Sequence, residues 1–439
     1  MFLYSKVYTE IEGEKMKKFI INKLFGRFNY EFEFKPDGLT ILTGPNGYGK
    51  STILRCIEAL TNELLGLNFF ISLDFETIQL FFEQEIVYIK KDNKSLDVNG
   101  IILNFSEFND VIEKISLRRP YLSRIDENTL FDRRRGVRID VNEYLEKYYK
   151  IDMDLDLFEA DNIIKDDLLK QLKHIKNLIG NIYFIKEQRL IKELKNNRAE
   201  QEIENVINEL PNRFLALMKN ILADYSAVSN KLDSSYPFRL FNNIEEISES
   251  DYVRMMDEMN KKFEKLNKYD LATMNYSSNV IFKKEHAKAL KIYFDDFDEK
   301  YQIYKDFLNK LDIYTTIIDD RLSFKKIKIT REKGISIVDS DNENKELNLN
   351  QLSSGEKQEI VLFYELIFGT KDNVTLLIDE PEISLHIVWQ KKFMDDLLSI
   401  INYKHINAIV ATHSPQIINN HWEMQIDLGE LYGLQLDKM

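Results

Sequence analysis

One short loop constrains the fold of this chain more than any other segment. The sequence Gly-Pro-Asn-Gly-Tyr-Gly-Lys-Ser at residues 44–51 fits GxxxxGK[ST], and it lies between an apolar β-pattern at 39–43 and a helical pattern at 51–65. Glycines there let backbone N–H groups turn toward phosphate oxygens at the start of a helix. Lys50 adds positive charge near the β- and γ-phosphates, and the Ser51 hydroxyl is a ligand for Mg²⁺. The loop predicts a nucleoside triphosphate site formed by Gly44, Pro45, Asn46, Gly47, Tyr48, Gly49, Lys50, Ser51 and Thr52.

Two acidic residues end a later apolar run. Residues 374–379 are nearly continuous β-formers, as expected of a buried parallel strand, and they end in Asp379, which Glu380 follows. Asp379 can hold Mg²⁺, usually through water. Glu380 is positioned to orient and deprotonate an attacking water, and such a base contributes about 10² to 10⁴ in rate. With the loop, this pair predicts hydrolysis of the nucleotide with Glu380 as catalytic base.

A histidine, His413, follows the last apolar strand pattern at residues 406–412. At this position a histidine could donate a hydrogen bond to the γ-phosphate and sense its loss. The alternative is a packed or surface histidine. The position of His413 after a strand, at the expected distance from the acidic pair, favours the catalytic role.

The composition is that of an ordinary globular protein. The chain has 439 residues, of which 44% are apolar and 30% charged, so it suits one large domain with an insertion or two domains. Its net charge of -13 gives no general attraction for nucleic acid, so DNA contact needs a local basic patch. The single cysteine, Cys56, fits a reducing compartment, and no stretch approaches a membrane span. A cytoplasmic protein without a membrane partner is expected. Residues before Met16, a second candidate start, are expected to be unimportant for the fold.

The hydrophobic pattern changes between residues 200 and 320, where apolar residues recur in steps of three and four. This periodicity predicts long helices. The runs are Ile203, Ile207, Leu210, Phe214, Leu217, Ile221, Tyr225, Val228 and Leu232; then Tyr252, Met256, Met259, Phe263 and Leu266; then Leu290, Phe294, Phe297, Tyr301, Tyr304, Leu308 and Leu311. Pro211 is expected to kink or restart the first helix. Two arrangements fit this pattern: a helical bundle that closes on itself and a protruding antiparallel coiled coil.

A further motif, Leu-Ser-Ser-Gly-Glu-Lys-Gln at 352–358, precedes the strand that ends in Asp379. Together with the loop and the acidic pair, it resembles the signature of the ABC-type ATPases. The acidic pair continues as Pro-Glu-Ile-Ser-Leu-His at 381–386, which is similar to the EPExxLH of RecF- and OLD-like ATPases, whereas transporter subunits usually have EPTSALD. The signature reads LSSGE rather than LSGGQ, and the motifs are too far apart for a transporter subunit. The resemblance, carried by residues 17–65, 181–190 and 350–416, is therefore to the SMC/RecF/OLD branch.

This resemblance implies a fold and a domain organisation. The fold class is α/β, an ABC-ATPase head with a P-loop NTPase core, a mixed sheet and a β-rich lobe, and the head is interrupted by a helical or coiled-coil insertion. We expect residues 1–190 to form the N-terminal half of the head with the β-rich lobe and a helical segment. Residues 191–325 would form the insertion. Residues 326–439 would form the C-terminal half, with the signature, the acidic pair and His413.

The resemblance also implies further site residues. Gln188 would couple Mg²⁺ and water to the insertion, and the alternative is a plain surface glutamine. Ser353 and the Gly355 amide would contact the γ-phosphate of a nucleotide held by a second copy of the chain. Ser384 to His386 would form the D-loop that crosses the interface between copies. ATP and Mg²⁺ would then be bound by a head-to-head homodimer or a higher oligomer.

Two segments, 352–368 and 376–393, are similar to the ATPase subunit of the PARIS anti-phage defence system and its relatives. That family implies a toprim-type effector nuclease, a phage-derived trigger and oligomeric assembly. The tail after His413 is too short for the toprim domain that OLD-type nucleases carry, so a nuclease is expected in trans. The leading hypothesis is an ATPase that senses a trigger and holds or releases a separate nuclease. The alternatives are an SMC/RecF-like DNA repair or DNA-end-binding ATPase, and a nucleotide-gated scaffold with little hydrolysis.

One region concentrates positive charge, and its members are Arg118, Arg119, Arg124, Arg133, Arg134, Arg135 and Arg138. This cluster is the best candidate for an anion or nucleic-acid surface. The favoured alternative is a solvated face paired with nearby acidic residues, because surface charge runs usually have no partner. Nucleic acid is therefore not the favoured partner. Lys325, Lys326 and Lys328 are expected to be exposed edge charges on a strand.

Overall fold

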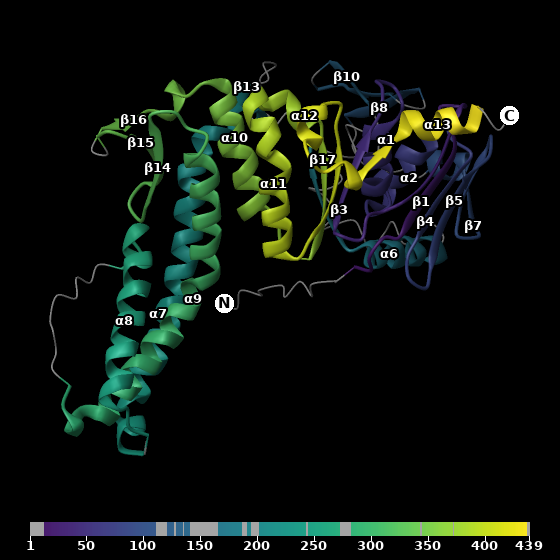
Figure 1. Cartoon of the computed structure of the whole chain (residues 1–439). Helices are drawn as coiled ribbons and strands as arrows, with labels where there is room; N and C mark the ends of the chain where they lie inside the picture. The colour runs from purple at the N-terminus through teal and green to yellow at the C-terminus, as the bar shows by residue number, and fades with distance from the viewer. Residues whose placement is uncertain are drawn as a thin grey trace. The chain divides into compact units, whose positions relative to one another are not determined.

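The computed structural model describes residues 13–110, 121–126, 129–134, 136–140, 166–186, 191–194, 202–242, 245–272, 282–342, 345–371 and 373–436. These residues form two compact units (Figure 1). The first unit contains the described residues up to 186 and those from 370 onward. The second contains 191–194 and the described residues from 202 to 369. Residues 326–369 group with the helices of the second unit, and the three segments expected from the sequence stay a prediction.

A parallel sheet forms the centre of the first unit. Its strands, in sheet order, are β11 (Asn181–Ile185), β17 (Val374–Asp379), β18 (Asn407–Ala411), β3 (Leu39–Thr43) and β19 (Gln425–Asp427), and neighbouring strands pair in parallel. β3, β17 and β18 are buried almost throughout, which explains their continuous apolar sequences. Because parallel strands end at one edge of a sheet, these three strands bring the glycine loop, the acidic pair and residues 412–414 together.

A second, antiparallel sheet forms the expected β-rich lobe. In sheet order it consists of β2 (Phe28–Glu33), β1 (Lys18–Leu24), β4 (Thr77–Phe81), β5 (Ile86–Lys91), β6 (Ser95–Val98) and β7 (Ile101–Asn104). In β2, buried Phe28, Tyr30 and Phe32 alternate with residues that are more open to solvent, as expected of a strand with one buried face. A smaller antiparallel sheet contains β8 (Leu122–Asp126), β9 (Thr129–Asp132) and β10 (Val137–Asp140).

One hydrophobic core joins both large sheets of the first unit to α1 (Lys50–Ala59), α2 (Glu63–Ser72), α6 (Asp166–Ile179) and α13 (Leu428–Leu436). The unit also contains the helices α11 (Ile387–Lys404) and α12 (Pro415–Ile418). The core contains Phe19 of the antiparallel sheet, Leu42 and Leu377 of the parallel sheet, and Leu172 of α6. Cys56 on α1 belongs to the same core, and burial raises the pKa of its thiol. The glycine loop therefore connects a strand, β3, and a helix, α1, that both pack in this core.

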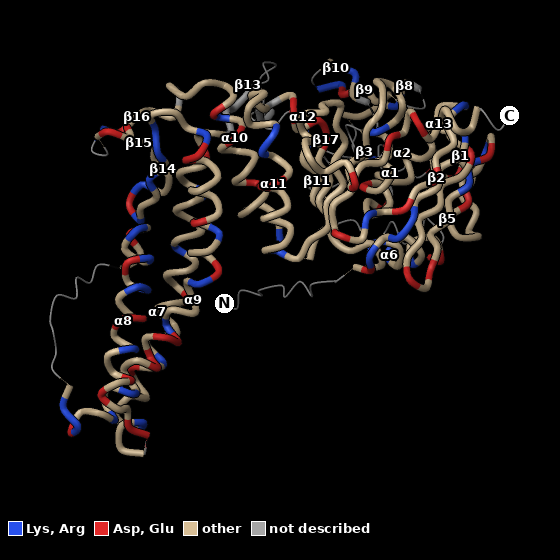
Figure 2. The backbone as a smooth tube through the Cα atoms, viewed as in Figure 1, with Lys and Arg blue, Asp and Glu red and all other residues tan. Residues whose placement is uncertain are grey.

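Three helices make up most of the second unit. They are α7 (Leu210–Asn242), α8 (Glu249–Lys268) and α9 (Ala287–Asp319). α7 and α9 run antiparallel, since Tyr225 packs on Tyr304 while Arg239 pairs with Asp296, which lies earlier on α9. α8 also packs on α9, for example through Phe263 and Phe297. Figure 2 shows Lys and Arg interspersed with Asp and Glu along these helices, so neither sign of charge dominates them.

Shorter elements flank the helices of the second unit. They are β12 (Ile191–Leu194) and β13 (Glu202–Asn205), which pair with each other; the sheet of β14 (Lys325–Thr330), β15 (Gly334–Asp339) and β16 (Glu346–Leu347); and α10 (Ser354–Tyr364). The expectation that Ile203 and Ile207 lie on the first long helix is wrong, because Ile203 lies on β13 and Ile207 in a 3₁₀ turn. Pro211 has no N–H and is tolerated in the first turn of a helix, so α7 starts at Leu210.

The predicted fold class is confirmed. The first unit is an α/β ATPase fold with a β-rich lobe, and the second supplies the long helices of the expected insertion. None of the helices in the described part of the chain combines the length and the apolar character that crossing a membrane requires.

A buried ion pair joins the end of α9 to α10. Arg321 Nε lies 3.2 Å from Glu359 Oε2, and both side chains are 2% exposed. The Arg321 guanidinium also lies 4.7 Å from the centre of the Phe363 ring. Nearby, the Tyr314 hydroxyl donates a hydrogen bond to the Ile360 carbonyl at 3.0 Å. The long helix and α10 are thus held together by polar contacts inside the core.

Removing one charge of this pair should destabilise the second unit. We expect Glu359→Ala to lower the free energy of unfolding by about 3–5 kcal/mol, because Arg321 then stays buried without this carboxylate. A double variant, Arg321→Met with Glu359→Leu, should recover most of the loss, since no buried charge remains. Urea unfolding followed by circular dichroism measures both effects. A double variant as unstable as Glu359→Ala would contradict this account.

Candidate functional site

The glycine loop offers an open anion site at the start of α1. Gly49 has a φ of 89°, and a Cβ there would lie 2.6 Å from Leu24 Cδ2, so the position requires glycine. A Cβ on Gly47 would meet nothing within 4 Å, which leaves that side of the loop open. No side chain caps α1, so its first N–H groups have no capping acceptor. An uncapped helix start beneath an open glycine loop fits a phosphate group.

Lys50 is the cation of the loop, and it is 4% exposed. Its ammonium donates to the carbonyls of Gly44 at 2.8 Å and Pro45 at 3.2 Å, and it lies 3.1 Å from His413 Nδ1. Burial lowers the pKa of Lys50, and this effect is opposed by four carboxylates: Glu380, Glu382, Asp379 and Asp427. The ammonium is therefore held at the loop, among acidic groups, by contacts that a phosphate could replace.

The two predicted metal ligands of the first unit lie together. Ser51 Oγ donates a hydrogen bond of 2.8 Å to Asp379 Oδ1, although the two residues are 328 positions apart. Asp379 ends β17, and its backbone pairs with Ala411 of β18. Magnesium prefers oxygen ligands and is usually held by one or two protein oxygens together with substrate phosphates. The donor set of Ser51 and Asp379 fits Mg²⁺ beside the loop.

Glu380 and His413 form the next layer of the site. Glu380 has a left-handed backbone, with φ 46°, and its N–H donates to the Ala411 carbonyl at 2.9 Å. Its Oε1 lies 3.3 Å from His413 Nε2, and both side chains are partly exposed. Because the Lys50 ammonium can only donate, His413 Nδ1 accepts, and its Nε2 carries the proton that faces Glu380. The Glu380 carboxylate and the His413 imidazole are thus both partly exposed to solvent beside Asp379.

The assignment to a family follows from a sequence match. The model of a family described as AAA ATPase domain matches residues 16–418, which is most of the chain. The chain belongs to the AAA ATPase domain family. The match confirms the broad prediction of an ATP-binding ATPase. No curated protein matches its sequence significantly.

Solved structures similar to this AAA ATPase include SMC head domains. One is the Smc head domain with an extended coiled coil bound to the C-terminal domain of ScpA, from Pyrococcus furiosus, with 12% identity, a TM-score of 0.35, and coverage of 92% of this chain and 91% of that chain. Another is the SMC head domain from Thermotoga maritima, with 13% identity, a TM-score of 0.32 and the same coverage. These TM-scores are low, so the family assignment rests on the sequence match.

A carboxylate that we did not predict holds the His413 segment of the AAA ATPase. Glu382 Oε1 accepts hydrogen bonds from Thr412 Oγ1 at 2.8 Å, from the His413 N–H at 2.6 Å and from the Ser414 N–H at 3.1 Å. The Gln390 amide in turn donates to the Glu382 carbonyl at 3.3 Å. The only sequence signal for this role is the acidic residue of the motif at 381–386. Glu382 therefore positions the segment that carries His413.

Substituting Glu382 should affect turnover through His413. We expect Glu382→Ala to lower kcat by about tenfold, because three bonds that hold the His413 segment are lost, while KM for ATP changes little. Glu382→Gln keeps an acceptor oxygen and should retain most of the activity. Steady-state kinetics of both variants measure the effect. Equal losses in the two variants would contradict a positioning role.

The signature residues lie in the second unit of the AAA ATPase. Ser353 is exposed and caps α10: its Oγ accepts from the Glu356 N–H at 3.3 Å, and its N–H donates to Glu356 Oε2 at 2.8 Å. Gly355 stands in the first turn of α10. Lys325 donates to Glu356 Oε1 at 2.7 Å, so the expectation of a merely exposed edge charge is wrong for Lys325. Burial opposes ionisation of Glu356, but the bonds from Lys325 and Ser353 outweigh it and lower its pKa.

The D-loop residues follow β17. Ser384 ends a short helix, Pro381–Ser384, and His386 caps α11 by accepting from the Val388 N–H at 3.4 Å. Next to His386, three apolar side chains are more than half exposed: Ile383, Ile387 and Val388. The segment is therefore an apolar surface feature next to the site.

Other predicted residues have mixed surroundings. Tyr48 packs its ring on Phe28 at 5.1 Å and accepts a hydrogen bond from Tyr30 with its carbonyl, so it also stabilises the loop. Pro45 and Asn46 are exposed, and Thr52 is half-buried on α1.

Some of the residues singled out from the sequence lie outside the described part of the chain. Gln188, Arg118, Arg119 and Arg135 lie outside the described residues. Arg124 of the same cluster donates to Asn109 at 2.8 Å.

Proposed function

We propose that this ATPase domain hydrolyses ATP with Mg²⁺ and that two copies close head to head around the nucleotides. The observation that carries the first half is the contact between Ser51 and Asp379, with Lys50, Glu380 and His413 directly around it. A nucleophilic water, a metal and a γ-phosphate are the groups that such a set of residues can serve.

The roles of the residues follow from their chemistry. Lys50 would pair with the β- and γ-phosphates, and the Ser51 hydroxyl and Asp379 carboxylate would hold the metal. Bound Mg²⁺ would neutralise charge on the phosphates. The Glu380 carboxylate would accept a proton from the attacking water, and the His413 Nε2–H would donate to the γ-phosphate. The contact of 3.3 Å between His413 and Glu380 supports a coupled action of the two groups.

Two features support closure onto a second copy. Ser353 is exposed at the N-terminus of α10, where the helix dipole favours an anion such as a γ-phosphate. The exposed Ile383, Ile387 and Val388 beside His386 supply apolar surface of the kind that a protein partner covers. In this arrangement Ser353 and Gly355 of one copy would cap the nucleotide of the other, and Ser384 and His386 would lie in the interface.

The cellular role rests on the resemblance of residues 352–368 and 376–393. We infer an anti-phage defence ATPase that holds a separate toprim-type nuclease and releases it when a phage-derived trigger is sensed. A DNA-end-binding role is the second candidate, and the exposed Arg133, Arg134 and Arg138 favour it. The net charge of -13 favours the first. DNA binding that survives replacement of these three arginines by glutamate would remove the local support for the second.

The test measures mass and partner binding together. The full chain is purified alone and with a toprim-type nuclease, with and without ATP and Mg²⁺, and its mass is measured by light scattering. ATP should double the mass of the chain, and Ser353→Arg should prevent this because it blocks the start of α10. The matched control is Ser226→Arg, an exposed serine on α7. A mass that does not change when ATP is added would overturn head closure. Nuclease binding that does not change when ATP is added would overturn the proposed ATP-dependent release of the nuclease.

A further inference from the structure

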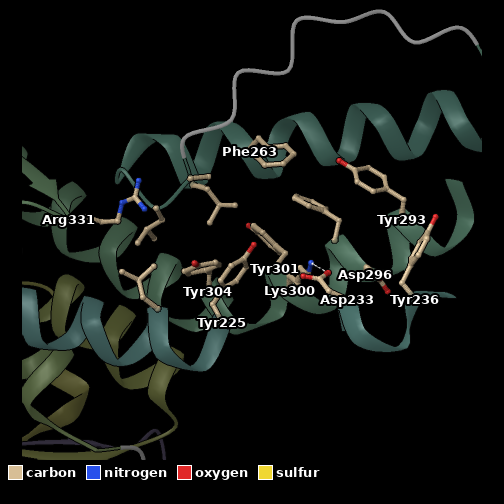
Figure 3. Close-up of a pocket in the computed structure, with 15 residues that line it drawn as sticks. Tyr225, Asp233, Tyr236, Phe263, Tyr293, Asp296, Lys300, Tyr301, Tyr304 and Arg331 are labelled. Carbon is tan, nitrogen blue, oxygen red and sulfur yellow. Dashed lines mark hydrogen bonds and ion pairs between the residues drawn. The ribbon is translucent and has the colours of Figure 1, made fainter. Parts of the chain in front are cut away.

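A cavity of about 500 Å³ lies among the helices of the second unit, within the range of sites for small molecules. Residues of α7, α8 and α9 line it, together with Arg331 just after β14 (Figure 3). On α9 the lining runs from Tyr293 to Tyr304, which corresponds to about 16 Å along the helix. The cavity is therefore long enough for a molecule with two chemically different ends.

Aromatic rings form much of the wall. Tyr225 and Tyr304 lie 5.2 Å apart between ring centres, and Phe263 and Phe297 lie 4.7 Å apart. Tyr301 continues the same wall, 6.2 Å from Phe297. Figure 3 shows Tyr225, Tyr301 and Tyr304 gathered at the centre of the cavity. Such rings favour a planar aromatic ligand, because each stacked ring contributes to binding.

Two tyrosine hydroxyls of the lining, those of Tyr301 and Tyr304, have no partner among the described residues. Tyr304 is 3% exposed and Tyr301 is 9% exposed, yet neither hydroxyl makes a hydrogen bond to another described residue. Burial raises the pKa of Tyr304 to about 12, so its hydroxyl keeps its proton. A buried polar group normally has a partner. The hydroxyls of Tyr301 and Tyr304, on residues that line the cavity, lack a partner within the described chain and are therefore available to a ligand with hydrogen-bonding atoms.

The charges of the wall differ in how they are paired. Asp233 accepts from Lys300 at 2.9 Å, and Asp296 accepts from Arg239 at 2.8 Å, so both carboxylates are engaged. At the end next to Tyr304, Arg331 forms a longer ion pair, with 3.6 Å between its Nη2 and Asp270 Oδ1, and its backbone N–H donates to Asp270 Oδ2 at 3.2 Å. The Arg331 ion pair is the longest of these three, so an acidic ligand group could compete with Asp270 for its guanidinium, which binds phosphate or carboxylate in a bidentate manner.

We propose that this cavity is a binding site for a small molecule that joins a planar aromatic ring to an acidic group. The ring would lie against Tyr225, Tyr301 and Tyr304, with its polar edge at the hydroxyls, and the acidic group would pair with Arg331. Nucleoside monophosphates and aromatic amino acids are the two sources of this chemistry. The site is separate from the phosphate loop, so it would give the helical unit a ligand of its own.

The test uses the full chain carrying Lys50→Ala, which disables the phosphate loop, and isothermal titration calorimetry. The probes are AMP, GMP, CMP and UMP as one set and L-tryptophan and L-phenylalanine as the other. Adenosine supplies a ring without the acid, and ribose 5-phosphate supplies the acid without the ring. At least one probe of the two sets should bind about tenfold more tightly than adenosine and ribose 5-phosphate, because a charge-assisted contact is added. The set that binds identifies the source.

Variants of the cavity locate the binding. Leu222→Trp fills the cavity with an indole and should abolish binding. Arg331→Ala should remove the advantage of the acidic group, and Tyr304→Phe should weaken binding by about threefold to tenfold. The control is Phe241→Ala, an aromatic residue of α7 that is 86% exposed and lies outside the lining. Absence of binding by every probe, or binding that is unchanged in Leu222→Trp, would overturn the proposal, and neither result bears on hydrolysis at Glu380.

Discussion

Replacing Lys50 with alanine should weaken ATP binding by about 100-fold or more. The ammonium is the positive charge that the loop presents, and contacts between a cation and phosphate are worth about 1.5–3 kcal/mol each. The fold should survive this change. Burial lowers the pKa of Lys50, which means that its charge is less favourable in the folded chain than in the unfolded chain. Fluorescent-nucleotide titration measures the affinity, and thermal unfolding measures the fold.

The lowered pKa of Lys50 sets the direction of its effect on stability. When folding lowers the pKa of a lysine, its charged form reduces the free energy of unfolding. This reduction is complete at pH values below the pKa in the folded state, and it disappears as the pH rises past the pKa in the unfolded state, about 10.4. Lys50→Met should therefore unfold at the same temperature as the wild type or higher at pH 7, while it fails to bind ATP. Lys170→Ala, an exposed lysine on α6, is the matched control. Tight ATP binding by Lys50→Ala would refute the role of the loop.

Replacing Glu380 with glutamine should lower kcat by about 10² to 10⁴ and leave ATP affinity nearly unchanged. Glutamine has the same shape but cannot accept a proton from water at neutral pH. Its amide still fills the position 3.3 Å from His413, so the geometry around Lys50 is retained. ATP should consequently accumulate in the bound form, and with it the closed pair of heads.

Single-turnover kinetics and light scattering in the presence of ATP measure these two effects of Glu380→Gln. The matched control is Glu423→Gln, an exposed carboxylate in the same unit. Turnover near the wild-type rate would show that Glu380 is not the base. Lost turnover without accumulation of a larger species would separate the hydrolysis from the proposed head closure.

The candidate nucleotide site could be predicted from local sequence because each of its parts is a short motif. The loop, the acidic pair and the buried strands before them can each be recognised within a few residues. Their meeting at one edge follows from the parallel order of β17, β18 and β3, which makes the contact between Ser51 and Asp379 a consequence of topology. Gln188 could not be tested in the same way, since it lies outside the described residues.

The unpredicted parts depend on contacts that no short motif encodes. Glu382 accepts from residues 412–414 because two neighbouring strands end side by side, and the sequence does not say which carboxylate faces that segment. Lys325 reaches Glu356 across 31 positions, although its own surroundings read as a strand edge. The start of α7 at Leu210 agrees with the expectation that Pro211 restarts the helix, whereas Ile203 and Ile207 do not belong to it. The apolar spacing continues through Ile203, but the backbone requirement of Pro211 decides where the helix begins.

The strand order of the central sheet also governs when the site can exist during synthesis. β3 carries the glycine loop and is made early, but its two neighbours, β18 and β19, come from residues 407–411 and 425–427. A ribosome must therefore translate nearly the whole chain before the loop gains either of its flanking strands. We expect arrested nascent chains that end before Asn407 to bind no ATP. Nucleotide binding would then show that translation has passed the strands that flank β3.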